Sequence, residues 1–138
     1  MASYVKYTAA VEPLVEAGNA GTDTWKVALA LTVNIADTTF TAGTTDLATG
    51  GGYTQGGNTC TTTSSSQTSG TYKLVLANPA TWTASGAGFT FRYAILYNST
   101  TGVPFGYWDY GSSVAMNGTN GDTFTVNLDA TNGVFSVT

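Results

Sequence analysis

Eight carboxylates are the groups in this sequence that could perform acid–base chemistry, since the chain contains no histidine. A glycosidase would need two of them facing each other about 5–10 Å apart across a cleft. Nothing in their spacing singles out such a pair. Asp23, Asp122 and Asp129 lie near glycine or asparagine, which is typical of turn and capping residues. The residues therefore predict no catalytic site and a protein that is not an enzyme.

Metal and redox chemistry have equally few candidate groups. Without histidine, imidazole-ligated metals and Ser-His-Asp triads are excluded, and the single cysteine, Cys60, cannot form an intrachain disulfide. The segments 117–122 and 129–133 contain oxygen atoms that could bind calcium. Neither matches the twelve-residue calcium loop, and turn chemistry explains both. We expect no metal and no cofactor.

The aromatic run Tyr107-Trp108-Asp109-Tyr110 could contact a carbohydrate, since exposed rings stack on sugar faces. In this hypothesis Trp108, Asp109 and Tyr110 touch the glycan. On a strand, however, alternation places Trp108 and Tyr110 on one face and Tyr107 on the other, so part of the run belongs to the core. The favoured interpretation is core and interface aromatics, with Asp109 as a hydrogen-bonded structural residue near a strand end.

The elements that must position these residues are predicted to be strands. The 138 residues include 27 Thr, 10 Ser and 17 Gly, whereas only 9% are charged. Such a composition favours pleated surfaces joined by tight turns. Apolar residues alternate over 25–35 and 89–97, and shorter runs cover 72–76, 105–110, 124–128 and 134–137. The segment 117–121, Asn-Gly-Thr-Asn-Gly, is the strongest hairpin signal.

Strands at this spacing predict a mainly β protein, an antiparallel β-sandwich of jelly-roll type. We expect one domain over 1–138, in which an N-terminal arm or short helix (1–22) precedes the sandwich (23–138). Tyr4, Tyr7, Val11 and Leu14 recur at helical steps, although Pro13 should end or kink a helix.

A self-contained core explains two segments least, namely the N-terminal arm and the glycine-rich loop 50–57. We therefore expect a partner interface there, carried by residues Tyr4, Tyr7, Val11, Leu14 and Tyr53. The net charge of −4 argues against a nucleic-acid partner. No stretch of about 18 apolar residues and no basic-then-apolar leader is present, so we expect a soluble protein without a membrane partner.

Several segments resemble small structural proteins of tailed bacteriophages. They are Asp23-Thr24-Trp25-Lys26-Val27-Ala28-Leu29, the runs 94–98 and 104–109, and Gly121-Asp122-Thr123-Phe124-Thr125-Val126-Asn127. The resemblance follows nearly the whole chain in order, and it consists of strand and turn patterns without catalytic signatures.

This resemblance implies a non-enzymatic virion protein, with capsid decoration (cement) as the expected role. Such a protein would be assembled in the host cytoplasm, form a homotrimer and bind the major capsid protein on the capsid surface. The alternative is a carbohydrate-binding, host-attachment module of a tail fibre or head fibre.

Overall fold

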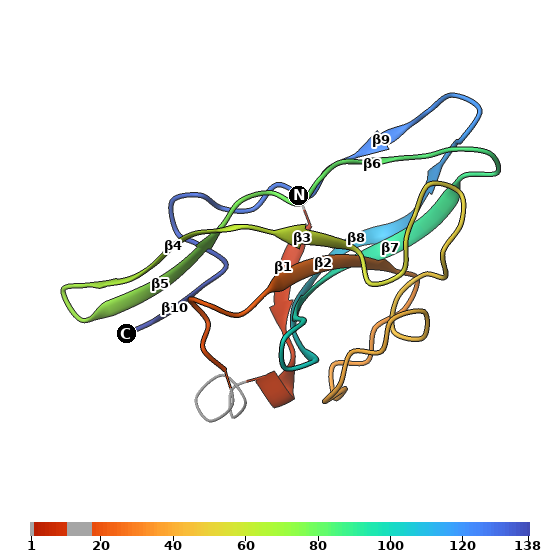
Figure 1. Cartoon of the computed structure of the whole chain (residues 1–138). Helices are drawn as coiled ribbons and strands as arrows, with labels where there is room; N and C mark the ends of the chain where they lie inside the picture. The colour runs from red at the N-terminus through yellow and green to blue at the C-terminus, as the bar shows by residue number, and fades with distance from the viewer. Residues whose placement is uncertain (1, 11–17) are drawn as a thin grey trace.

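The computed structural model describes residues 2–10 and 18–138, and antiparallel strands dominate it (Figure 1). The predicted mainly β, antiparallel class is confirmed. In chain order the elements are β1 (Ser3–Lys6), the 3-10 turn η1 (Thr8–Ala10), β2 (Trp25–Ala30), β3 (Asn58–Cys60), β4 (Thr62–Thr68), β5 (Thr71–Leu76), β6 (Trp82–Thr83), β7 (Phe89–Asn98), β8 (Val103–Met116), β9 (Thr123–Phe124) and β10 (Phe135–Val137).

The largest sheet has five strands in the order β1-β8-β7-β2-β3. Its centre is β7, an alternating apolar strand whose residues Leu96 and Ala94 lie opposite Val27 and Leu29 of β2. On the other side of β7, Ala94 lies opposite Trp108 of β8. The alternating apolar residues of β2 and β7 are buried as the period of two predicts. Most residues on the other face of these strands are buried as well, so the predicted single buried face is exceeded.

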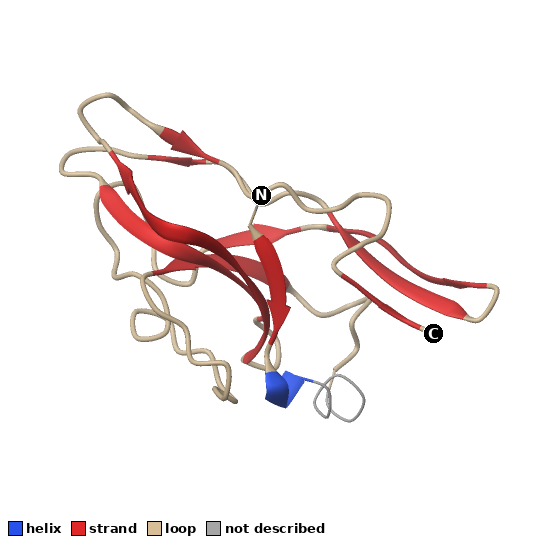
Figure 2. Ribbon diagram, turned by 180° about the vertical axis from the view of Figure 1, so that it is seen from behind, coloured by secondary structure: helices blue, strands red, loops and turns tan. Residues whose placement is uncertain are grey.

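Two smaller sheets, β10-β5-β4 and β6-β9, lie toward different ends of the large sheet (Figures 1 and 2). Aromatic contacts join these layers. The ring centroids of Trp25 and Phe135 are 6.2 Å apart, and those of Phe91 and Phe124 are 4.4 Å apart. On the opposite face of the large sheet, Phe40 of the loop after β2 stacks on Tyr97 at 3.7 Å. The core therefore extends to both sides of the large sheet.

The predicted strand 25–35 is too long, because β2 ends at Ala30. Leu31 is 50% exposed and Ile35 is 39% exposed, although both continue the apolar alternation. The pairing of β2 with β7 stops at Ala30 and Tyr93, just where the register of β7 against β8 shifts. Alternating apolar residues form no hydrogen-bonded ladder unless a neighbouring strand pairs with them, so the residues after Ala30 leave the sheet.

Of the predicted N-terminal arm or short helix, the structure shows no α-helix over the residues that it describes before position 11. Residues 3–6 form β1, an edge strand that pairs with β8 through Tyr4 and Trp108, and only Thr8–Ala10 make a single 3-10 turn. The rest of the proposed helical stripe, Val11 and Leu14, lies outside the described residues. The arm is thus partly an element of the large sheet, since Tyr4 gains a cross-strand aromatic partner there.

The segment 117–121 turns the chain but does not make the predicted hairpin. The N–H of Asp122 donates to the carbonyl of Asn117, which closes the turn. The strands on either side nevertheless join different sheets, since β8 pairs with β7 and β1 whereas β9 pairs with β6. Local turn chemistry therefore sets the reversal but does not decide which strands pair.

Candidate functional site

A recess on the surface gathers aromatic residues from β8 and β9. It has a volume of about 250 Å³, and we call it the aromatic recess; it is lined by Ala2, Trp108, Tyr110, Phe124, Thr125, Val126 and Asn127. Trp108 and Tyr110 line it together, as their alternation along the strand predicts. Tyr107 belongs elsewhere, since its ring packs edge-on against Tyr7 and Tyr93.

Neighbouring rings hold the walls of the aromatic recess in place. The ring of Tyr4 lies 4.8 Å from that of Trp108. Tyr110 stands edge-on to both Phe91 and Phe124, at 5.8 and 5.4 Å. Edge-to-face and tilted contacts of this kind add to the energy of simple area burial. The recess is therefore built from side chains that have few alternative positions.

Asp109 does not belong to the recess, although it was predicted as a possible glycan contact beside Trp108 and Tyr110. Its carboxylate accepts two hydrogen bonds from Arg92, both 2.9 Å long, and a third from the N–H of Gly111 at 2.8 Å. The Arg92 guanidinium, followed by the Gly111 bond, lowers the pKa of Asp109 below its usual value. These contacts agree with the prediction that Asp109 is a hydrogen-bonded structural residue.

The predicted partner interface is not an exposed surface in the described residues. Tyr7 is completely buried and Tyr53 is 1% exposed. Tyr4 is half-buried beside Trp108, and its hydroxyl is enclosed over Gly106, where a Cβ would lie 2.0 Å from the tyrosine oxygen. Burial raises the pKa of all three phenols. Tyr7 and Tyr53 are core residues and Tyr4 packs against the core, because strand pairing and loop packing enclose them.

The loop that carries Tyr53 is fastened to the large sheet by a buried carboxylate. Asp46 is 7% exposed and accepts hydrogen bonds from the N–H groups of Gly43 and Gly56, each 2.6 Å long, and from the Tyr53 hydroxyl. The Tyr53 oxygen in turn accepts the N–H of Leu29 at 3.1 Å. Sequence reasoning missed this cluster, since an aspartate between Thr45 and Leu47 carries no motif.

Three further carboxylates hold turns in place. Asp23, Asp122 and Asp129 accept backbone N–H bonds from Asn19, Asn117 and Thr131, as their positions predict. Within 2–10 and 18–138, no group of three or more His, Cys, Asp or Glu side chains is placed to hold a metal ion. Over the same ranges, no helix is long and apolar enough to cross a membrane.

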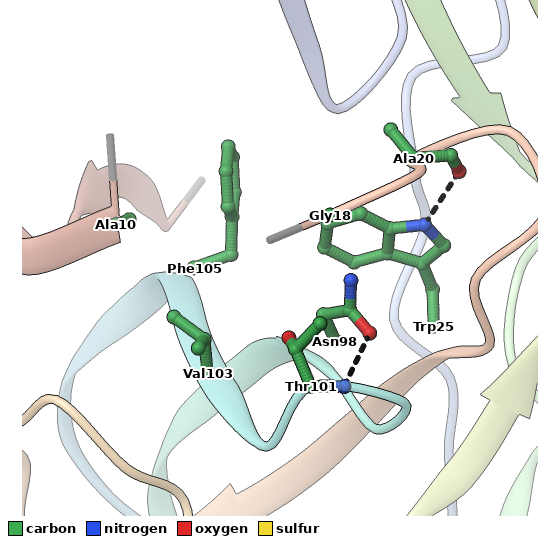
Figure 3. A pocket seen from close by; sticks show the side chains of 8 residues that line it. All are labelled: Ala10, Gly18, Ala20, Trp25, Asn98, Thr101, Val103 and Phe105. Carbon is green, nitrogen blue, oxygen red and sulfur yellow. Dashed lines mark hydrogen bonds between the residues drawn. The ribbon is translucent and has the colours of Figure 1, made fainter. Parts of the chain in front are cut away.

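A second, much smaller cavity lies beside Trp25 (Figure 3). Its volume of about 10 Å³ has room for one water molecule and not for an organic ligand. The Trp25 indole N–H donates to the carbonyl of Ala20, and the side-chain oxygen of Asn98 accepts the N–H of Thr101. These bonds satisfy the polar groups around the cavity, and its role is structural.

The most exposed element is β4, whose sequence Thr-Thr-Ser-Ser-Ser-Gln-Thr contains no charge and no proline. It forms a hairpin with β5 that extends away from the large sheet (Figure 1). One edge of β4 pairs with β5 and the other has no partner strand among the described residues. Beside it lies a shallow trough of about 630 Å³, whose lining includes Ser64, Ser66, Thr68, Thr71, Lys73 and Thr131.

We call β4 and this trough the hydroxyl surface.

Compared with known proteins, the chain matches no family model, no curated protein and no solved structure.

Proposed function

We propose that this chain is a non-enzymatic structural protein of a bacteriophage virion, a capsid decoration protein that binds the outer surface of the major capsid protein lattice. The observation that carries the proposal is the hydroxyl surface, an uncharged strand with an open edge on an extended hairpin. Natural proteins usually protect such edges with lysine or proline. An edge left without these residues is suited to pairing or packing against another chain.

The composition of the hydroxyl surface supports a broad contact of modest strength. A serine or threonine hydroxyl costs less free energy to remove from water than the charge of a lysine or glutamate. Only Lys73 contributes a charge to the trough. A protein that binds an assembled shell, and not its separate subunits, stabilises the shell by mass action.

A homotrimer would strengthen such binding without any tight single contact. Three linked copies bind a lattice with an avidity that exceeds the affinity of one copy by orders of magnitude. The resemblance of the sequence to tailed-phage structural proteins supports a capsid lattice as the partner, and the open edge of β4 supports the hydroxyl surface as the contact. Light scattering of the purified protein measures the oligomeric state separately.

The proposal is tested by co-sedimentation with capsids that lack this chain. We expect the wild-type protein to sediment with the capsids, and the double variant Ser64→Lys/Ser66→Lys to bind at least about tenfold more weakly, because two lysines on the edge oppose strand pairing and desolvation. Both serines are exposed, so the fold should tolerate the change.

A matched control is Thr38→Lys/Thr39→Lys, which adds the same charge at two exposed positions outside the hydroxyl surface. This control should bind like wild type. A wild-type protein that stays in the supernatant, or purified virions in which mass spectrometry does not find the chain, would overturn the proposal. An equal loss of capsid binding in both double variants would show a general effect of charge. The hydroxyl surface would then no longer be the proposed contact.

A further inference from the structure

We propose that the aromatic recess is a binding site for a neutral carbohydrate, with room for one pyranose unit. The inference is independent of the capsid proposal and needs no second chain. The rings of Trp108, Tyr110 and Phe124 line the recess together, so apolar side chains dominate the site. The C–H face of a sugar ring matches such surfaces, as stacking on aromatic rings requires.

The size of the recess selects a small ligand. Its volume of about 250 Å³ is just below the ~300 Å³ at which sites for drug-sized molecules begin. Monosaccharides are smaller than such molecules. The recess therefore accommodates one sugar ring, and the rest of a glycan would continue into solvent.

Unpaired polar atoms at the recess match the hydroxyl groups of a sugar. Among the described residues, the indole N–H of Trp108 and the hydroxyl of Tyr110 have no hydrogen-bond partner, and neither is a buried orphan. Asn127 accepts a bond from Asn78 through its side-chain oxygen at 3.1 Å, which leaves its amide N–H groups as donors. Hydrogen-bonding groups beside apolar rings can orient a ligand that has both an apolar face and polar groups, as a sugar does.

The charges around the recess favour a neutral sugar over an anionic one. Among the described residues that line the recess none is charged, and Asp109, the nearest carboxylate in sequence, is occupied by Arg92. An anionic ligand would lose hydration without gaining a cationic partner from this lining. The walls are also held before binding, by Tyr4 behind Trp108 and by Phe91 behind Tyr110. Preorganised walls reduce the ordering cost of binding.

The tryptophan residues provide a specific signal for the test. Trp25 and Trp82 are 1% and 3% exposed, whereas Trp108 is half-buried at the recess. The probes are the methyl glycosides of glucose, galactose, mannose and N-acetylglucosamine, with glucuronic acid as the charged counterpart of glucose. We expect at least one neutral sugar to shift the fluorescence and the indole N–H resonance of Trp108 with a Kd of about 1 mM, and glucuronic acid to bind more weakly.

The variant Asn127→Asp removes the donor amide while its oxygens can still accept the bond from Asn78. It should raise the Kd about three- to tenfold, the value of one hydrogen bond. Asn120→Asp is the matched control, since it makes the same charge change at an exposed turn residue and should bind like wild type.

Two results would overturn this inference. One is the absence of any shift with all four neutral sugars at about 50 mM, well above a millimolar Kd. The other is a shift that Asn127→Asp leaves unchanged or that maps to residues outside the recess.

Discussion

At the scale of single residues, the buried polar groups of this protein hold loops in place. Asp46 is the clearest case, because its carboxylate accepts the N–H of Gly43 and, from the glycine-rich loop 50–57, the N–H of Gly56 and the phenol of Tyr53. A buried carboxylate is costly unless such bonds are made. The loop from 50 to 57 is consequently part of the packed structure, and its conformation depends on one side chain that no sequence motif marks.

The ion pair between Arg92 and Asp109 predicts how stability depends on pH. Its side chains are about one-third exposed, and the pKa of Asp109 lies below the ordinary value of 3.8 in the folded protein. A lowered pKa stabilises the folded state above that value, and this contribution is lost as the pH falls through the folded pKa. We therefore expect the free energy of unfolding, measured with urea, to fall on acidification below about pH 4.

The variant Asp109→Asn should show a shallower fall over the same pH range, because the titrating group is absent. Arg92→Gln removes the pair from the other side and should flatten the dependence as well. If both variants keep the full acid dependence of the wild type, the loss of stability belongs to other carboxylates. Asp129, whose pKa is lowered by bonds from Asn132 and Thr131, would then be the next to examine.

At the scale of elements, glycines set how closely the loop 50–57 approaches the sheet. A Cβ at Gly57 would lie 2.0 Å from the carbonyl oxygen of Val27, and the φ of this residue is +66°. Gly70, in the β4–β5 turn, has a φ of +85° and open space around the same position. The two glycines thus share the backbone conformation and differ in their surroundings.

We expect Gly70→Ala to lower the free energy of unfolding by about 1–2 kcal/mol, the cost of a left-handed conformation for alanine. Gly57→Ala should cost roughly 3 kcal/mol or more, since the clash with β2 adds to the same backbone cost. Chemical denaturation of the two variants measures the difference. Equal losses would mean that the loop moves away from β2 without cost, contrary to its packing.

The elements also show which parts of the fold could be predicted from the sequence. Alternation predicted β5, β7 and β10, because these strands have both an apolar face and a partner. It predicted β2 too long, since Leu31 and Ile35 alternate without a neighbour to pair with. The helical spacing of Tyr4 and Tyr7 also predicted an arm or short helix, whereas residues 3–6, with Tyr4 among them, pair with β8 in the large sheet.

Only part of the candidate site could be predicted from the sequence. Alternation along one strand placed Trp108 and Tyr110 on one face, and they line the recess together. Phe124 and Asn127 come to the same recess because β9 packs across the end of the large sheet, a contact between segments that no local pattern encodes. Asp109 was grouped with its neighbours in sequence, whereas its partner Arg92 lies on the adjacent strand.

At the scale of the whole molecule, one stretch of chain joins the two layers. β3 pairs with β2 in the large sheet, and β4 pairs with β5 in the second sheet after the single residue Thr61. Cys60, at the end of β3, is 3% exposed and lies opposite Trp25. Exposure of its thiol should therefore require both sheets to separate, so the described layers are expected to unfold as one cooperative unit.

The reactivity of Cys60 tests this cooperativity. Burial raises the pKa of the thiol to about 12, so the folded protein holds almost no thiolate near neutral pH. We expect a thiol reagent to label Cys60 only after global opening. The free energy of opening derived from labelling should then equal that from circular dichroism, and both should fall with urea at the same slope. A Thr38→Cys/Cys60→Ala variant, with its thiol at an exposed position, should react at once. A labelling free energy well below the global value, with a smaller urea slope, would instead show that β3 opens by itself and that the two sheets are separate units.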